Sequence, residues 1–268
     1  MKNILQVLLL SLSIASFAQK NEIIVVGNVH TPMDRYNADS LYAIMEKVKP
    51  DIILHEIDKS FFTKDFKFKD PSKENEQNAS ERYFAKQPQV MLRPFEFEGR
   101  NEYRREKGIK QSENPTMRIL DSLYSSGKLT EKQRATVSEY RRLTEQLNSF
   151  GYLSAINFNN PKTDSISKLR QYYQHHEIRK VINEQPVFSQ VFVTTTSGKK
   201  VSLKEGYNEF CDFWDLRNKT MAKNILKYAK ENPGKKIMVL TGYFHRYYLL
   251  EELKKANNKN VVIKEFYE

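Results

Sequence analysis

The stretch that decides the fold is Glu22-Ile23-Ile24-Val25-Val26-Gly27-Asn28-Val29-His30. Its run of β-branched residues predicts a short buried strand over 22–26, and residues 27–30 are expected to form the turn that follows it. The apolar spacing over 37–48 predicts a helix capped by Asn37 or Asp39, and Pro50 ends it. Residues 51–57 predict a second strand, so the unit indicates parallel strands joined by a right-handed crossover.

The C-terminal part of the chain repeats this pattern. A helix is predicted over 216–231, a strand over 236–240, a turn over Gly242-Tyr243-Phe244-His245, a helix over 247–255 and a closing strand over 261–263. The two strand–Gly-x-x-His–helix–strand units predict an α/β fold with a mixed, largely parallel sheet. The glycine of each unit is expected to permit a tight turn with positive φ and a close backbone approach.

The segment between these units has a different pattern. A further strand is predicted over 89–97, and residues 115–183 are mostly helical in spacing, with a capping box at Thr130 and another helix start at Asp164. Residues 191–203 predict a hairpin around Ser197-Gly198, and the charged stretch 62–80 is expected to be a mobile loop. We therefore expect a helical insertion over about 100–205 that covers or borders the functional site.

The N-terminus has the pattern of a secretory signal peptide. Lys2 precedes an apolar run over 4–17, and small residues at Ser16 and Ala18 suit cleavage after Ala18. The run is shorter than the ~20 residues of a membrane span, so we expect no transmembrane anchor. The expected organisation is a signal peptide over 1–18 and a single domain over 19–268, in a protein exported to the periplasm or the extracellular space.

Composition narrows the functional class. The chain has 268 residues, one cysteine and a net charge of +11, of which Lys2 would leave with the signal peptide. A single cysteine excludes an internal disulfide framework and a cysteine-rich zinc module. The basic residues are spread along helical segments, so we expect solvated helix faces, with contact to an anionic envelope surface as the alternative and no nucleic-acid partner.

Three polar residues are predicted at the carboxyl ends of the parallel strands, where ligands bind in open α/β sheets. His30 follows the first strand, Glu56 ends the second and His245 follows the late strand. Two imidazoles and one carboxylate suit a divalent metal such as Zn²⁺, Mn²⁺ or Co²⁺, with an open position for water. The alternative is that the histidines cap helices or fill polar pockets and that Glu56 pairs with a lysine or arginine.

Four blocks in this order resemble the signatures of the TraB/Tiki superfamily, which includes GumN-like proteins. They are Val26-Gly27-Asn28-Val29-His30-Thr31-Pro32-Met33-Asp34-Arg35, Pro50-Asp51-Ile52-Ile53-Leu54-His55-Glu56-Ile57-Asp58, Arg217-Asn218-Lys219-Thr220-Met221-Ala222 and Gly242-Tyr243-Phe244-His245. The sequence departs from the family pattern in having Asn28 where threonine is usual and the bulky Tyr243-Phe244 in the last block.

This resemblance implies a fold shared with erythromycin esterases and ChaN haem-binding proteins. From the Tiki branch it implies a metal-dependent protease. Carried over residue by residue, it implies that His30, Glu56 and His245 are ligands or catalytic groups, and that Arg217 stabilises an oxyanion or an anionic substrate group.

For the remaining histidines and the cysteine, the sequence predicts structural roles and no part in catalysis. His175 and His176 are expected to be an exposed pair that forms no single site, since helical neighbours point about 100° apart. His55 is expected to be buried on the face opposite Glu56, and Cys211 to be a buried thiol. Second-tier candidates for the crevice are Arg35, Glu96, Glu98 and Arg100.

Two functions remain open from the sequence. The first is a hydrolase of peptide or ester bonds, in which a metal-bound water or a water activated by Glu56 attacks the carbonyl while His30 and His245 hold the metal or act as acid and base. The second is a binding protein without turnover, with haem or another ligand against an aromatic wall of Tyr243, Phe244, Tyr247 and Tyr248. A third is an envelope-interaction protein in which these motifs are relics.

Overall fold

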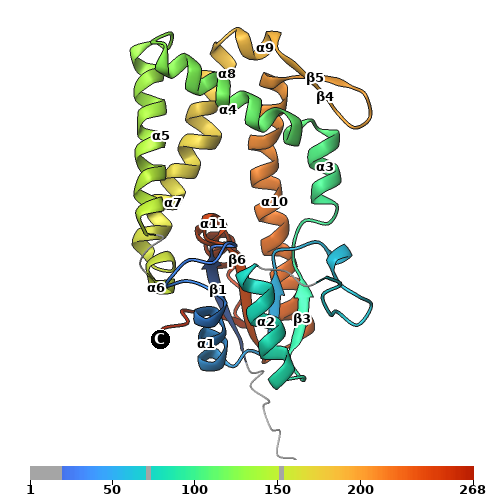
Figure 1. Ribbon diagram of the computed structural model, residues 1–268. Helices are drawn as coiled ribbons and strands as arrows, with labels where there is room; N and C mark the ends of the chain where they lie inside the picture. Colours follow the sequence, from blue (N-terminus) through green and yellow to red (C-terminus); the bar gives the residue numbers. More distant parts are fainter. Residues whose placement is uncertain (1–19, 71–73, 151–153) are drawn as a thin grey trace, which may run out of the picture.

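The computed structural model describes residues 20–70, 74–150 and 154–268, so the predicted signal peptide lies outside the described residues. A five-stranded sheet has the order β3-β2-β6-β1-β7, and each pair of neighbours is parallel. The strands are β1 (Asn21–Asn28), β2 (Ile52–His55), β3 (Met91–Pro94), β6 (Lys236–Gly242) and β7 (Val261–Lys264) (Figure 1). The predicted α/β class with a largely parallel sheet is confirmed.

The two halves of the chain interleave in this sheet. Strand β6 lies between β1 and β2, and its register with β1 runs from Glu22 opposite Lys236 to Asn28 opposite Gly242. The two Gly-x-x-His segments therefore leave the sheet side by side at the same carboxyl edge, as the repeated pattern predicted.

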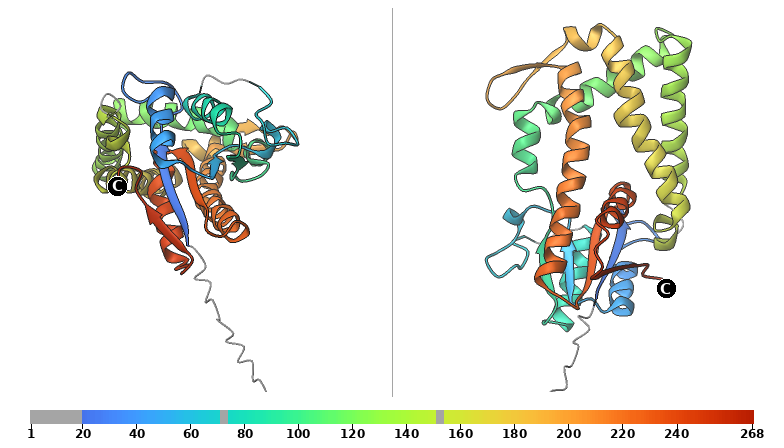
Figure 2. Two further views of the ribbon diagram at one scale, coloured as in Figure 1. Left: turned by 90° about the horizontal axis from the view of Figure 1, so that it is seen from below. Right: turned by 180° about the vertical axis from the view of Figure 1, so that it is seen from behind.

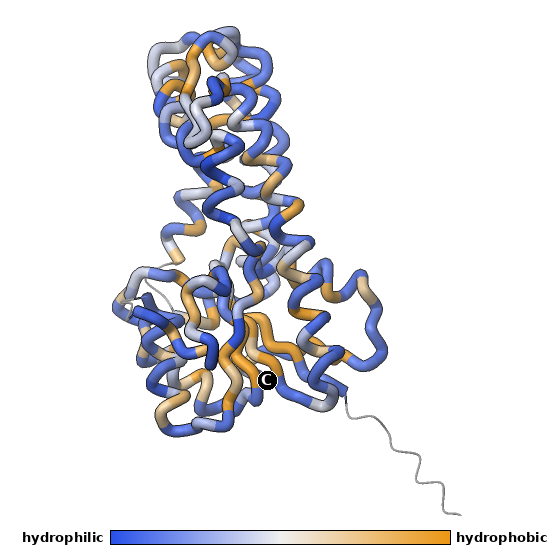
Figure 3. Tube along the Cα trace, turned by 90° about the vertical axis from the view of Figure 1, so that its right-hand side faces the viewer, coloured by the Kyte–Doolittle hydropathy of each residue, from blue (hydrophilic) through white to orange (hydrophobic). Residues whose placement is uncertain are grey.

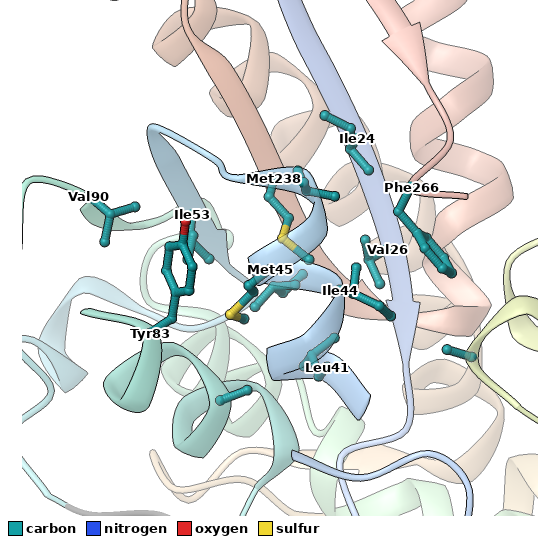
Figure 4. Packing of buried hydrophobic residues seen from close by; sticks show 14 of the residues in the cluster. Ile24, Val26, Leu41, Ile44, Met45, Ile53, Tyr83, Val90, Met238 and Phe266 are labelled. Carbon is teal, nitrogen blue, oxygen red and sulfur yellow. The ribbon is translucent and has the colours of Figure 1, made fainter. Parts of the chain in front are cut away.

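Helices cover both faces of the sheet. On one face, α1 (Ala38–Val48) and α2 (Asn75–Lys86) pack against the strands. Leu41 and Met45 of α1 and Tyr83 of α2 share a cluster with the strand residues Ile53 and Met238 (Figure 4). On the other face lie the C-terminal half of α10 (Leu203–Glu231) and α11 (Tyr243–Lys255), as the view from behind in Figure 2 shows. Burial of apolar strands on both faces is the usual condition of a parallel sheet.

Neither motif glycine has positive φ, and close packing explains the glycine only at position 27. Gly27 is within β1 and Gly242 has a φ of −56°, so the expected left-handed turns are absent at both positions. A Cβ built on Gly27 would lie 3.0 Å from the Cα of Tyr243, so a larger residue there would require the backbone of α11 to shift. Helix α11 begins directly at Tyr243, so His245 lies in its first turn and not in a preceding loop.

The expected insertion is present and rises from the carboxyl edge of the sheet (Figures 1 and 2). Its apolar side chains form a separate cluster around Leu120, Ile178 and Phe188. Its elements are α3 (Arg100–Glu106), α4 (Ile109–Ser125), α5 (Glu131–Ser149), α6 (Ala155–Phe158), α7 (Pro161–Tyr172), a π-helical segment (Tyr173–Glu177), α8 (Ile178–Glu184), α9 (Val187–Gln190) and the hairpin β4 (Phe192–Thr194) with β5 (Lys200–Ser202).

Hydropathy follows this division (Figure 3). Apolar residues concentrate in the strands, whereas the helices of the insertion are mostly hydrophilic with apolar positions at intervals. Among the described residues, no helix has both the length and the hydropathy needed to cross a membrane.

Helix α10 joins the insertion to the sheet. It begins at Leu203, well before the predicted start at 216, because Ser202 and Glu205 form a capping box there. With 29 residues it is about 43 Å long at 1.5 Å per residue. One continuous helix therefore carries Cys211, Trp214 and Arg217 from the insertion down to the sheet edge.

Buried polar contacts also attach the insertion to the sheet. Asn159 accepts a hydrogen bond from the Gly27 amide at 2.6 Å and donates to the Gly27 carbonyl at 2.9 Å. Arg246 is fully buried and bonds to Asp164 of α7, to Glu265 and to the Val25 carbonyl. These contacts restrain the insertion against the carboxyl edge, where the candidate site lies.

The prediction of a loop over 62–80 is wrong for its last part. Residues 75–80 belong to α2, whose polar residues Asn75, Glu76 and Ser80 are buried against β1 and its following turn. The sequence of this segment lacks apolar residues at helical spacing, so the pattern gives no prediction of a helix. Packing of polar side chains, including a bond from Asn75 Nδ2 to the Val29 carbonyl at 2.7 Å, determines where this helix lies.

Acid is expected to destabilise the protein through His55, which is 2% exposed and packs edge-on against Phe68 at 4.9 Å. Burial lowers the pKa of His55 from 6.5 to about 3. The unfolded chain therefore takes up this proton first, and the free energy of unfolding falls by up to about 1.4 kcal/mol per pH unit between these two pKa values as the pH drops. His55→Phe should remove about one proton from this dependence in urea unfolding at several pH values. The exposed His176→Phe is the control, and an unchanged slope in His55→Phe would contradict the assignment.

Candidate functional site

The three residues predicted as ligands meet around Gly242. A Cβ built on Gly242 would lie 3.4 Å from His30 Nε2, 3.7 Å from His245 Cδ2 and 3.8 Å from Glu56 Oε2. His30 follows β1, Glu56 follows β2 directly and His245 is in the first turn of α11 after β6. Adjacent parallel strands therefore bring these side chains to one place.

His30 is oriented by a carboxylate. Its Nδ1 lies 2.5 Å from Glu76 Oε1, and Asn28 Nδ2 donates to the same oxygen at 3.0 Å. The bond to Glu76 raises the pKa of His30 to about 9, against the opposing effect of burial. The imidazole is therefore protonated at neutral pH, and its side chain is 52% exposed on a cavity.

His245 is buried and neutral. Arg217 can only donate, so the 2.7 Å contact from Arg217 Nη1 makes His245 Nε2 the acceptor. Nδ1 then carries the proton and donates to Asn218 Oδ1 at 2.7 Å. Burial is the main reason that the pKa of His245 is lowered to about 3. The ring also stacks on Trp214, with centroids 4.4 Å apart.

Glu56 accepts hydrogen bonds at both carboxylate oxygens. Oε2 receives the Thr241 hydroxyl at 2.5 Å and the Gly242 amide at 2.7 Å, while Oε1 receives Arg217 Nη2 at 2.5 Å. Burial opposes ionisation, but the positive charge of Arg217 and the hydrogen bond from the Thr241 hydroxyl hold the pKa of Glu56 well below its usual range. Glu56 is therefore a fixed negative charge at the strand end.

Arg217 connects His245 and Glu56 to a second carboxylate, that of Glu96. Its Nε donates to Glu96 Oε1 at 2.8 Å and its Nη2 donates to Glu96 Oε2 as well as to Glu56. Glu96 follows β3, and its side chain is completely buried. The guanidinium thus occupies the centre of a buried network and directs its donors to atoms of Glu56 and His245 that a metal would also use.

Among the described residues, one group of potential ligand atoms lies within 4.8 Å of one another, and it consists of His30, Glu74 and Glu76. It shares His30 with the predicted set and uses α2 in place of Glu56 and His245. Oε2 of Glu76 is buried without a hydrogen-bond partner. The ligand atoms of His30, Glu56 and His245 do not all lie within this distance of one another, so a metal shared by these three would require them to move closer. The two sets are alternatives, because both use His30.

Two cavities border the site. The larger, of about 620 Å³, is lined by His30, the apolar Phe68 and Leu240, Arg100 and the acidic residues Glu56, Asp70, Glu74 and Glu76. The smaller, of about 240 Å³, lies between the insertion, α10 and α11, and Arg100 and Arg217 are in its wall. One cavity is therefore rich in carboxylates and the other in guanidinium groups.

Of the four second-tier candidates, two are exposed and two belong to the network around Arg217. Arg35 and Glu98 are exposed, whereas Glu96 binds Arg217 and Arg100 donates to Glu96 at 3.1 Å. Cys211 is buried, and burial raises the pKa of its thiol to about 12, which suits a structural residue. The predicted aromatic residues do not form one wall. Tyr243 packs against the hydrophobic core beside α1, whereas Phe244 lines the smaller cavity.

The prediction for His175 is wrong. It is 3% exposed, and its ring stacks on Trp214, while His176 is exposed as expected. The prediction of exposure rested on the polar sequence around the pair, whereas His175 packs against the rings of Phe210 and Trp214 from α10. It lies in the π-helical segment, which departs from regular helical spacing.

Sequence reasoning missed the residues that orient the histidines. Asn218 was visible only as part of the Arg217-Asn218 pair, and Trp214 only as one aromatic residue among several. Glu76 gave no signal, because it lies in a polar stretch far along the chain from His30. All three act through contacts between distant segments.

Comparison with known families gives one match. Residues 127–250 match the family described as "Haem-binding uptake, Tiki superfamily, ChaN", which is less than half of the chain. This segment contains Arg217, Asn218 and His245 but neither His30 nor Glu56. Searches of curated proteins and of solved structures found no match. The resemblance to erythromycin esterases and to TraB or GumN-like proteins stays a prediction. Over this segment the chain is similar to the Tiki superfamily.

Proposed function

We propose that this protein is a hydrolase of peptide or ester bonds that uses a divalent metal held by His30, Glu56 and His245. The observation that carries the proposal is the orientation of the two imidazole rings. Each ring contacts an acceptor on a neighbouring helix through Nδ1, and these acceptors are Glu76 for His30 and Asn218 for His245. Histidines that bind metals are held in this way by a second partner. His30 is protonated at neutral pH, so its Nε2 must release a proton before it can bind a metal.

The donor set fits a divalent metal in chemical type. Two imidazole nitrogens and one carboxylate suit Zn²⁺, Mn²⁺ or Co²⁺. Arg217 donates to His245 Nε2 and to Glu56 Oε1, so metal binding requires Arg217 to give up these two bonds. Its two bonds to Glu96 can remain, and they keep the guanidinium beside the site.

The residues of the chain have distinct tasks in this proposal. A bound metal would supply Lewis acidity, which polarises a carbonyl and makes water a better nucleophile near neutral pH. Arg217 keeps a permanent positive charge beside the ligands, where it offsets the negative charge that develops on the carbonyl oxygen. Glu76 and Asn218 keep the imidazole rings in position. The exposed side of His30 faces the larger cavity, through which substrate reaches the site.

The proposal is tested with protein stripped of metal by a chelator. We expect one equivalent of Zn²⁺, Mn²⁺ or Co²⁺ to bind in calorimetric titration and to restore hydrolysis of a panel of peptides and esters. His30→Ala and His245→Ala should lose both properties. Glu74→Gln separates the alternative set at α2, because metal binding that needs Glu74 but not His245 would place the ion there. Absence of binding and hydrolysis in the wild type would refute the proposal.

Glu76→Gln should weaken metal binding by about 10- to 100-fold, since the His30 ring loses its charged acceptor. Glu81→Gln is the matched control, because Glu81 is an exposed residue of the same helix. Isothermal titration of both variants with the same metal measures the difference. Equal affinities would show that Glu76 does not position His30 for a metal.

Haem binding is the second candidate, favoured by the description of the matched family. The cavity of about 620 Å³ is within the range of ligand pockets, and His30 could face an iron. The cavity is lined by four acidic residues, which would repel the negatively charged propionates of haem, so we place this function second. These residues are Glu56, Asp70, Glu74 and Glu76. A visible absorption band on addition of haem that is lost in His30→Ala would reverse this order.

A further inference from the structure

The smaller cavity, of about 240 Å³, has features that the proposed catalysis does not use. Helices α3, α4, α7, α10 and α11 and the π-helical segment line it. Arg217 is in its wall, and Trp214, also in the wall, stacks on His245. A group bound in this cavity therefore lies next to the candidate site.

The cavity carries an excess of positive charge. Arg100 bonds to Glu96, and Arg104 bonds to Glu113 at 2.6 Å. Arg170 has no carboxylate partner among the described residues. Its donors contact the neutral oxygens of Gln171, Gln174, Tyr140 and Thr144. Its guanidinium lies 4.7 Å from the centroid of Phe244, so a cationic group that is hydrogen-bonded only to neutral oxygens stands beside an apolar wall.

His175 gives an independent indication that the cavity takes a polar ligand. It is 3% exposed and lines the cavity, yet neither ring nitrogen has a hydrogen-bond partner. Buried polar atoms without partners are rare, because the lost hydration costs about 1–3 kcal/mol per group. Its ring is held between Trp214 and Phe210, with both centroids 4.9 Å away. The ring is thus positioned by stacking, with hydrogen-bonding capacity left over.

The backbone at this place is also unusual. His175 lies in the π-helical segment Tyr173–Glu177, and such segments occur frequently at functional sites. In a regular helix the residues would turn by 100° each and the ring would be placed differently. The segment therefore brings His175 into the cavity wall opposite α10.

Size and lining together narrow the ligand. A volume of about 240 Å³ is below the usual 300–1,000 Å³ of pockets for whole ligands, so it admits one residue-sized group and excludes haem. Arg170 suits a carboxylate, and Phe213, Trp214 and Phe244 suit an apolar or aromatic side chain. A single amino-acid residue with a free carboxylate combines both features.

We propose that this cavity binds the C-terminal residue of the substrate, with its carboxylate at Arg170 and its side chain against Phe213, Trp214 and Phe244. The inference rests on the proposed function and names its substrate class, which is a peptide or N-acyl amino acid with a free carboxylate and an apolar last residue. The amide before that residue then reaches the candidate site. Its hydrolysis consumes one water and releases the free amino acid and the acyl carboxylate.

The chain offers a direct probe, since Trp214 is its single tryptophan and lies in the cavity wall. Its fluorescence is followed during titration with N-acetyl-L-phenylalanine and with N-acetyl-L-phenylalaninamide, which differ only in the terminal charge. Chelator is present throughout, so the result does not depend on a metal. We expect the carboxylate to bind about tenfold or more tightly than the amide. Equal affinities in the wild type would overturn the inference without any variant.

Variants locate the preference within the cavity. Arg170→Gln should abolish it, and Arg170→Lys should retain part of it because the charge remains. Arg142→Gln is the matched control, since Arg142 is an exposed arginine of α5 paired with Glu139 outside the cavity. An undiminished preference in a folded Arg170→Gln protein would overturn the assignment of the carboxylate to Arg170.

A kinetic comparison separates this inference from the proposed function. Metal-loaded protein is given a peptide with a free C-terminus and the same peptide as its amide. Faster hydrolysis of the free peptide supports both proposals. A carboxylate preference in binding without any hydrolysis would refute the hydrolase and leave the binding cavity in place. Hydrolysis of both peptides at one rate would refute the cavity's role in substrate choice.

Discussion

Arg217→Ala is expected to lower the free energy of unfolding by about 3–5 kcal/mol, which is typical when one partner of a buried ion pair is removed. The substitution would leave Glu56 and Glu96 buried, with side chains 7% and 0% exposed, without their shared cation. Urea unfolding at neutral pH measures the loss. Arg142→Ala, which breaks an exposed pair with Glu139, should cost less than about 1 kcal/mol. A comparable loss in both variants would contradict a special role for the buried network.

The same variant distinguishes two roles of Arg217. Removal of its guanidinium frees Glu56 Oε1 and His245 Nε2, so we expect tighter metal binding and partial recovery of stability when metal is added. Hydrolysis should nevertheless fall by about 100- to 1,000-fold, since the positive charge beside the reacting carbonyl is lost. Weaker metal binding would show instead that Arg217 holds the ligands in place.

Glu56→Gln is expected to have the largest effect on metal and activity. The amide keeps the size of the side chain but removes the only negative charge among the three proposed ligands. We expect metal affinity to fall by more than about 100-fold, beyond the loss expected for an outer partner, with hydrolysis reduced at least as much. Calorimetry and initial rates measure both.

Glu98→Gln is the control for this substitution. Glu98 follows the same edge of the sheet but is exposed, and it takes no part in the network around Arg217. Its metal affinity and hydrolysis should equal those of the wild type. If Glu56→Gln also retains them, the ion belongs to the alternative set of His30, Glu74 and Glu76 or to no site on this edge.

Local sequence was sufficient for the sheet and for the place of three polar residues. The apolar runs over 22–26 and 236–240, each followed by Gly-x-x-His, predicted parallel strands with His30 and His245 at one edge. This works because strand burial and crossover handedness depend on short-range patterns and on general rules of chain geometry. The boundaries were less certain, and the capping box of Ser202 and Glu205 shows that one local signal for α10 was available and unused.

Tertiary structure alone decided how the site is arranged. Glu76 reaches His30 because α2 packs across the end of β1, and the polar sequence of α2 carries no periodic signal for that contact. His175 lies in a cavity wall because its ring packs against Phe210 and Trp214 of α10, and its π-helical segment departs from the fixed period of 3.6 residues. The partners of Arg217 come from strands and loops far away in the chain, so its competition with a metal could not be read from spacing. Periodicity places a residue on an element, but the charges and contacts around its side chain arise only when distant elements pack together.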